Sequence, residues 1–253
     1  MNSQKLKSLL VRESSFRRFF RSSILVTAFI YISFVMFAYL CSDGIIFQPQ
    51  KTSYNDGPHI IKVKTGDREL ISALYLQNPG AVFTFLYSHG NAEDLGNIRP
   101  ILEQIRNKGY SVFAYDYRGY GTSRGLPSEA NVYKDADAAY RYLTEHLKVP
   151  PNRIIVFGRS LGGAPAIYLA SKEPVAALIV EGSFVTAFRV MTRIPLVPFD
   201  KFRNIQRIGE VQCPVLIIHG ANDAVVPLWH GHRLFEEAGG PKLCLWGKRC
   251  RSQ

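Results

Sequence analysis

Apolar residues follow two different patterns along this chain, and the first is a single long run. Residues 24–41 are almost entirely apolar, and no charged residue falls between Arg21 and Asp43. A helix of roughly 20 residues spans about 30 Å, the thickness of the hydrocarbon core of a bilayer. The run is apolar on every face, unlike the one-sided stripe of a helix in a soluble domain. It therefore predicts a transmembrane helix over residues 22–42.

Basic residues precede this run and predict its orientation. Residues 1–21 contain one acidic residue, Glu13, and six basic ones, namely Lys5, Lys7, Arg12, Arg17, Arg18 and Arg21. Because positive residues favour the cytoplasmic side of a membrane, the N-terminus is predicted to lie in the cytoplasm. A cleaved signal peptide is the main alternative, although the run is long for one and no A-x-A cleavage site follows it.

The second pattern begins after the turn-forming residues of a predicted linker, 43–57. Short apolar runs alternate with helical stretches over residues 58–246, which indicates a parallel sheet covered on both faces. The predicted strands are 60–63, 70–76, 81–87, 110–115, 154–157, 176–180, 215–218 and 242–246, and the predicted helices are 98–108, 132–147, 161–171 and 228–238. Residues 183–209 are irregular and predict a short cap, and residues 247–253 form an atypical tail.

Composition narrows the function classes further. The formal net charge is +11, but the sequence contains neither a dense basic stripe nor a reading motif, so nucleic-acid binding is not predicted. The four cysteines do not make a disulfide framework in a chain of this length. Metal-ligand spacings such as H-E-x-x-H are absent from the sequence, so no cofactor is predicted.

A candidate nucleophile stands where a buried strand meets a helix of small residues. Residues 158–162 read Gly-Arg-Ser-Leu-Gly, which matches the G-x-S-x-G pattern. Glycines on both sides of Ser160 let the strand and the helix approach closely. The turn would expose the hydroxyl at a helix N-terminus, where negative charge is stabilised. A phosphate-binding turn is not favoured, because no G-x-x-x-x-G-K-[ST] pattern is present.

Four motifs in order resemble the α/β-hydrolase superfamily, and within it membrane-anchored abhydrolase-domain proteins and the serine-aminopeptidase-like branch. They are residues 88–94 (SHGNAED), 116–123 (DYRGYGTS), 158–162 (GRSLG) and 219–223 (HGAND). The resemblance implies an α/β-hydrolase fold, with Ser160 as nucleophile and Asp223 as the acid of a catalytic triad. It also implies oxyanion-hole donors at the backbone N–H groups of Asn91 and Leu161.

Three other polar residues are expected to have roles outside the main triad. Glu181, at the end of a predicted strand, is a reserve candidate for the acid. The resemblance implies that Asp116 braces the loop after it, and His89 is expected to be structural rather than a general base.

The general base is the missing part of the predicted triad. In the resembling family it is a histidine after the last strand, but residues 247–253 contain none. His230 and His232 follow Asp223 and are the nearest substitutes. The expectation is a truncated or altered hydrolase, impaired in cleaving esters, thioesters or amides of small-molecule, acylated or lipid-like substrates. The alternative is a non-catalytic, membrane-anchored binding or scaffold protein on a hydrolase fold.

Overall fold

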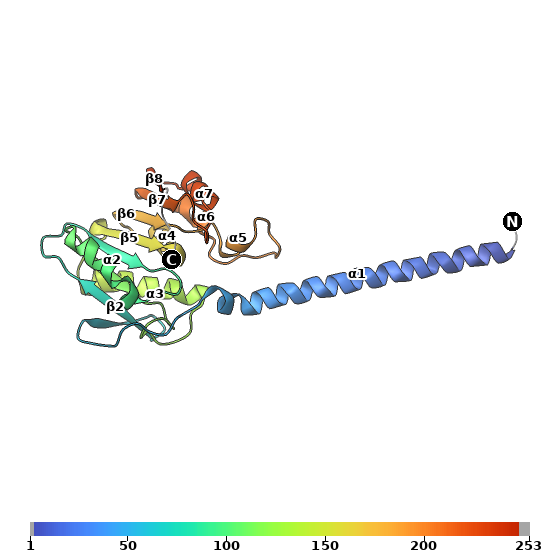
Figure 1. Cartoon of the computed structure of the whole chain (residues 1–253), viewed down its shortest axis with the longest axis horizontal. Coiled ribbons are helices and arrows are strands. Elements are labelled where there is room, and N and C mark those ends of the chain that lie inside the picture. The colour runs from blue at the N-terminus through green and yellow to red at the C-terminus, as the bar shows by residue number, and fades with distance from the viewer. Residues whose placement is uncertain (1–2, 248–253) are drawn as a thin grey trace. The chain divides into compact units, whose positions relative to one another are not determined.

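The computed structural model describes residues 3–247, and the chain divides into two units, Met1–Ser42 and Asp43–Gln253. Helix α1 begins at Ser3, makes up the described part of the first unit, and continues to Ile46, so that its last four residues belong to the second unit (Figure 1). Within α1, the 31 residues Phe16–Ile46 are long and apolar enough to be compatible with a single membrane span. The predicted boundary at residue 22 is not a structural one, because the helix runs through it. The orientation in the membrane stays a prediction.

The second unit contains an eight-stranded sheet in the order β1-β2-β4-β3-β5-β6-β7-β8. The two pairs β1–β2 and β2–β4 are antiparallel, and the later neighbours are parallel. The parallel strands therefore share one carboxyl edge, where loops usually carry ligand-binding residues. The strands are β1 (Ile60–Lys64), β2 (Leu70–Leu76), β3 (Thr84–Ser88), β4 (Ser111–Tyr115), β5 (Ile154–Arg159), β6 (Ala177–Glu181), β7 (Val215–Gly220) and β8 (Lys242–Gly247).

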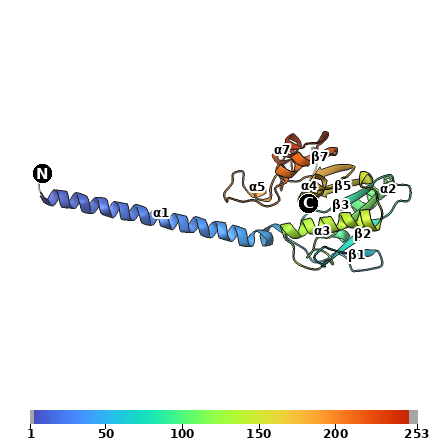
Figure 2. The same ribbon diagram turned by 180° about the vertical axis from the view of Figure 1, so that it is seen from behind.

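Helices cover both faces of this sheet, as Figures 1 and 2 show. Strand β4 separates two apolar clusters, because successive side chains point to opposite faces. Val112 and Ala114 pack with α2, whereas Phe113 and Tyr115 belong to the larger core under α3 and α4. The helices of the second unit are α2 (Leu95–Asn107), α3 (Glu129–Arg141), α4 (Gly163–Lys172), α5 (Ala187–Met191), α6 (Asn204–Arg207) and α7 (Trp229–Glu237).

The elements agree closely with those predicted from the apolar pattern. The sheet has the eight predicted strands, and β2 has the predicted bounds. Helix α2 starts earlier than predicted, because Asp94 caps it and accepts a hydrogen bond from the Asn97 backbone N–H at 3.0 Å. The predicted irregular cap contains the two short helices α5 and α6.

Residues 43–57 differ from the predicted linker, because they belong to the second unit and are bonded to it. The Ser53 backbone N–H donates to Asp94 Oδ2 at 2.7 Å, and the Tyr54 hydroxyl donates to Asp116 Oδ2 at 2.5 Å. Turn-forming residues indicate an irregular backbone, but they do not show whether distant side chains will hold it. This segment is a packed strap along the globular unit.

The turn from β5 into α4 is closely packed against the end of β3. A Cβ atom on Gly158 would overlap the carbonyl oxygen of Gly162, and a Cβ on Gly162 would overlap the carbonyl oxygen of Ser88. Backbone oxygens cannot move aside as a flexible side chain would. Glycine is therefore required at both positions for β3, β5 and α4 to meet.

We expect Gly162→Ala to lower the free energy of unfolding by about 1–3 kcal/mol, the usual effect of forcing an extra carbon into a packed interior. Gly57→Ala is the matched control, because no atom lies within 4 Å of its Cβ position. The control should change the free energy of unfolding by less than about 0.5 kcal/mol. Denaturant unfolding of the detergent-solubilised full chain measures both, and equal stabilities for the two variants would contradict the packing argument.

Candidate active site

Ser160 has a left-handed backbone, with a φ of +51°. It directly follows β5 and opens the 3₁₀ turn Ser160–Gly162 that leads into α4. A non-glycine residue in this region costs on the order of 1–3 kcal/mol, so its surroundings must enforce the conformation. The close contacts around Gly158 and Gly162 do so. The local geometry is the strained strand-to-helix turn expected of a nucleophile elbow.

The turn after β3 lies directly against this serine. The Cβ position of Gly90 is 3.6 Å from Cβ of Ser160. The Gly90 backbone N–H is already used, since it donates to Glu93 Oε2 at 2.8 Å. The Asn91 backbone N–H, by contrast, makes no hydrogen bond to the residues that the structure describes. It is therefore the available donor of this turn.

The side chain of Asn91 holds the turn in place through several partners. Its Nδ2 donates to the carbonyl oxygen of Ile46 at 2.6 Å. Its Oδ1 accepts from the Tyr120 hydroxyl at 2.6 Å and from the Gln48 backbone N–H at 3.1 Å. Because these bonds use the side chain alone, they fix the backbone of Asn91 without occupying its N–H.

An ion pair links the same turn to the elbow. Arg159 Nη1 lies 2.9 Å from Glu93 Oε1, and both side chains are about one-fifth exposed. Glu93 thus bonds Gly90 with one carboxylate oxygen and Arg159 with the other. The residue preceding the serine and the turn facing it are held at a fixed separation.

Leu161 supplies the second predicted oxyanion donor. It is buried, at 3% exposure, and lies in the first turn after β5. The first N–H groups of a helical segment have no acceptor within that segment. Two backbone N–H groups, from Asn91 and Leu161, therefore belong to the two turns that meet at Ser160.

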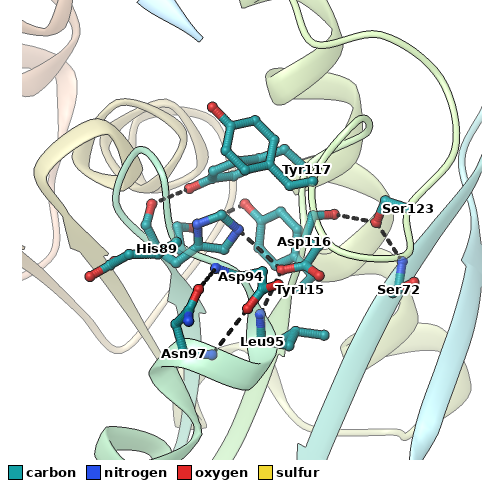
Figure 3. A network of polar contacts seen from close by, with 12 residues as sticks. Ser72, His89, Asp94, Leu95, Asn97, Tyr115, Asp116, Tyr117 and Ser123 are labelled. Atoms are coloured by element: carbon teal, nitrogen blue, oxygen red, sulfur yellow. Dashed lines mark hydrogen bonds and ion pairs between the residues drawn. The ribbon is translucent and has the colours of Figure 1, made fainter. Parts of the chain in front are cut away.

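His89 and Asp116 form a fully buried polar cluster beneath this edge (Figure 3). His89 Nδ1 lies 2.8 Å from the Gly90 carbonyl oxygen, and Nε2 lies 3.3 Å from Asp116 Oδ1. Asp116 Oδ1 also accepts the Leu95 backbone N–H at 2.9 Å, and the Tyr117 hydroxyl donates to the His89 carbonyl oxygen at 2.7 Å. These bonds tie β3, β4 and α2 together, so both residues have structural roles here.

Asp223 follows β7, two strands away from Ser160 in the sheet order. Its side chain is 3% exposed, and Oδ1 accepts the backbone N–H groups of Val225 and Val226, both at 2.9 Å. Oδ2 lies 3.9 Å from His219 Nε2 and 3.5 Å from the Cβ position of Gly182. The carboxylate is therefore oriented by its own loop.

Glu181, the reserve acid, ends β6 beside Arg159 in the sheet register. Burial raises the pKa of its carboxyl group. It makes no hydrogen bond to another side chain among the described residues, so nothing here orients it toward a base.

The two substitute histidines point in different directions from α7. His230 is buried, and its Nδ1 accepts the Val185 backbone N–H at 3.2 Å. Burial and the nearby His219 lower the pKa of His230 to about 4, so the ring is neutral and its proton is on Nε2. Neither nitrogen then has a free lone pair. His232 is exposed and packs on Trp246, with 4.5 Å between the ring centroids.

The apolar residues of the cap divide between buried and exposed positions. Phe184 is buried, and Phe188 packs on Phe199 with 5.7 Å between ring centroids, but Met191 and Ile194 are 85% and 65% exposed. A hollow of about 360 Å³ lies within the cap, with Thr186, Arg189, Val197 and Asp200 among its lining residues. Neither Ser160 nor Gly90 lines it, so this hollow is separate from the elbow.

Comparison with known sequences agrees with these features. A family model described as serine aminopeptidase, S33, matches residues 80–203. The chain is 36% identical over 195 residues to alpha/beta hydrolase domain-containing protein 17B of Xenopus tropicalis. The matched region covers 76% of this chain and 68% of that protein. It is 39% identical over 171 residues to alpha/beta hydrolase domain-containing protein aho-3 of Caenorhabditis elegans, covering 66% of this chain and 52% of that protein.

Solved structures share the fold. The Pyrococcus furiosus esterase Pf2001 superimposes with a TM-score of 0.68 at 20% identity, covering 81% of this chain and 90% of that one. The acetyl xylan esterase from Paenibacillus sp. R4 gives a TM-score of 0.63 at 17% identity, covering 79% and 82%. The chain belongs to the α/β-hydrolase superfamily. The family and fold predicted from its motifs are thereby confirmed.

In this α/β-hydrolase, the structure brings together Ser160, Asn91 and Leu161 at the carboxyl edge. Among residues 3–247 it places no histidine in hydrogen-bonding contact with Ser160. The loop after β8, where the resemblance implies the base, continues into residues 248–253, which lie outside the described part of the chain. The sequence analysis missed the contacts of Tyr120 and Gln48 with Asn91, because residues so distant in sequence give no local signal.

The His89–Asp116 contact predicts a pH-dependent stability. Burial lowers the pKa of His89, but the Asp116 carboxylate and the Gly90 carbonyl outweigh burial, so the net shift is upward. A histidine whose pKa is raised on folding stabilises the fold fully below its unfolded pKa, about 6.5, and loses this contribution as the pH rises through the folded value.

We therefore expect the stability difference between the natural chain and His89→Gln to be largest below about pH 6.5 and to shrink at higher pH. Denaturant unfolding across a pH series measures it. In an Asp116→Asn background the pH dependence of this difference should largely vanish. A difference that instead grows with pH would show that His89 is buried as a neutral ring.

Proposed function

We propose that this chain is a serine hydrolase that cleaves ester, thioester or amide bonds through an acyl intermediate on Ser160. The observation that carries the proposal is the left-handed backbone of Ser160, placed against a turn whose Asn91 N–H has no acceptor among the described residues. Strain of this kind persists only where the surroundings enforce it, and it is concentrated at functional sites. The esterase activity named for two structural neighbours supports the same reaction class.

The proposed reaction begins with attack of Ser160 Oγ on the substrate carbonyl carbon. The carbonyl oxygen then gains negative charge, which the N–H groups of Asn91 and Leu161 would stabilise. Collapse of this intermediate breaks the bond to the alcohol, thiol or amine, which leaves with a proton. Water then attacks the acyl-serine, releases the acid and restores the hydroxyl.

Proton transfer from Ser160 is the step for which the described residues offer no bonded general base. A serine hydroxyl needs a base to take its proton and a carboxylate to orient that base. All six histidines of the sequence lie in the described part of the chain, and none bonds Ser160. We propose that Asp223 orients a base that these 253 residues do not supply, so that Ser160 reacts slowly in this form.

The proposed substrates are acylated or lipid-like molecules. The apolar segment of α1 is compatible with a membrane span and would hold the enzyme where such molecules concentrate. The same placement would serve the second candidate function, a non-catalytic membrane-held binding protein. The lack of a base bonded to Ser160 among residues 3–247 is what favours that alternative.

Covalent labelling with a fluorophosphonate probe tests the proposal on the full chain in detergent. We expect slow labelling that Ser160→Ala abolishes and that added imidazole accelerates about tenfold or more, because a general base typically contributes 10²–10⁴ in rate. Asp223→Asn should remove most of this acceleration, whereas His232→Gln should leave it unchanged. A folded chain that imidazole does not activate would support the non-catalytic alternative.

A further inference from the structure

Residues 191–196 of the cap, here termed the cap tip, expose large apolar side chains to solvent. Met191 and Ile194 of the tip are 85% and 65% exposed, and Leu196 is 45% exposed. Three large apolar side chains therefore meet solvent within six residues. Pro195 lies between two of them. A short loop does not expose such residues together without a cost in hydration.

The base of the cap is well held, so this exposure does not reflect a loose chain. Asp200 accepts the Thr186 hydroxyl at 2.7 Å and the Phe188 backbone N–H at 3.0 Å. It also lies 3.4 Å from Arg189. The Ala187 backbone N–H donates to the Lys201 carbonyl oxygen at 2.8 Å, which closes the loop. Figures 1 and 2 show the segment after α5 projecting from the rest of the globular unit.

Cations flank the apolar tip. Residues 187–207 contain five basic residues and one acidic residue, Asp200. Arg189 is balanced by Asp200, and Lys201 lies 3.1 Å from Asp43. Arg193 and Arg203 are exposed, and neither forms an ion pair with any residue from 3 to 247. An apolar loop that carries uncompensated cations suits a membrane surface, where apolar side chains enter the acyl boundary and cations meet lipid phosphates.

The cap is also fastened to the part of the globular unit that immediately follows the apolar segment. Asp43, which binds Lys201, is the first charged residue after Arg21. Phe47 packs on Phe202 with 5.8 Å between ring centroids. If the charge-free segment crosses a bilayer, chain continuity keeps Asp43 at its surface. Seven residues of extended chain reach at most about 25 Å, so Ile194 lies within that distance of Lys201.

We propose that the cap tip docks into the lipid leaflet next to the membrane span, with Met191, Ile194 and Leu196 in the acyl boundary and Arg193 and Arg203 on lipid phosphates. Docking would hold the cap against the bilayer whether or not Ser160 is catalytically active. The proposal therefore stands apart from the hydrolase reaction, although it would bring a lipid-like substrate toward the domain.

The test uses the full chain in nanodiscs of phosphatidylcholine, with or without phosphatidylserine. The native cysteines are replaced by serine, and an environment-sensitive NBD label is placed at Ile194→Cys. Val82→Cys is the matched control, because Val82 is 59% exposed but lies just before β3, at the amino end of the parallel strands. Phe29→Cys, inside the apolar segment, reports insertion of the span.

We expect lipids with a shallow doxyl quencher to reduce the emission at position 194 at least several-fold more than at position 82. Quenching at 194 should rise with phosphatidylserine and fall in an Arg193→Glu, Arg203→Glu variant. Equal quenching at 194 and 82 would overturn the proposal, and so would a label at Phe29→Cys that remains unquenched by lipids with a deep doxyl group. A label at 194 that is solvent-exposed in every nanodisc but protected by an added protein would show a protein partner instead.

Discussion

The candidate site depends on one steric constraint, the close approach of three backbone segments at Gly158, Gly162 and Ser88. With glycine at 158 and 162, β5 can run directly under the start of α4, and α4 can start against the end of β3. The residue between the glycines is then forced into a left-handed conformation. That strain costs on the order of 1–3 kcal/mol, a sizeable part of the stability of a typical domain. The fold tolerates it because the same contacts also join the sheet to its central helix.

The turn at Gly90 and Asn91, which is proposed to supply an oxyanion donor, depends on contacts of another kind, made by groups from distant parts of the sequence. Asn91 is bonded by Tyr120 and by the backbone at residues 46 and 48, and Glu93 connects Gly90 with Arg159. Each bond leaves the Asn91 N–H unoccupied. The segment that emerges from the apolar helix is therefore part of the framework of the candidate site, since its backbone fixes the side chain of a proposed oxyanion residue.

Local features of the sequence were sufficient to predict the strands, the sheet class and the elbow. Apolar runs between turn residues mark the strands, and two glycines around Ser160 mark the turn, because both depend on neighbours in sequence. The strap over residues 43–57 was not predicted, since its bonds to Asp94 and Asp116 cross some 40 to 60 positions. The outward direction of Met191 and Ile194 is likewise not marked in the sequence. A loop without helical or strand period does not indicate which side of it faces the core.

Two buried histidines close to the Asp223 loop, His219 and His230, are each held in place by a hydrogen bond of their own. His219 Nε2 lies 2.7 Å from the Val226 carbonyl oxygen and so carries the proton, and the ring packs so closely on Gly231 that a Cβ atom there would overlap Nδ1. His230 has its lone pair on the Val185 N–H. Moving either ring toward Ser160 would break a buried hydrogen bond, which typically costs about 1–3 kcal/mol for the group left unpaired. Free imidazole carries no such cost, because its approach to Ser160 breaks no hydrogen bond of the fold.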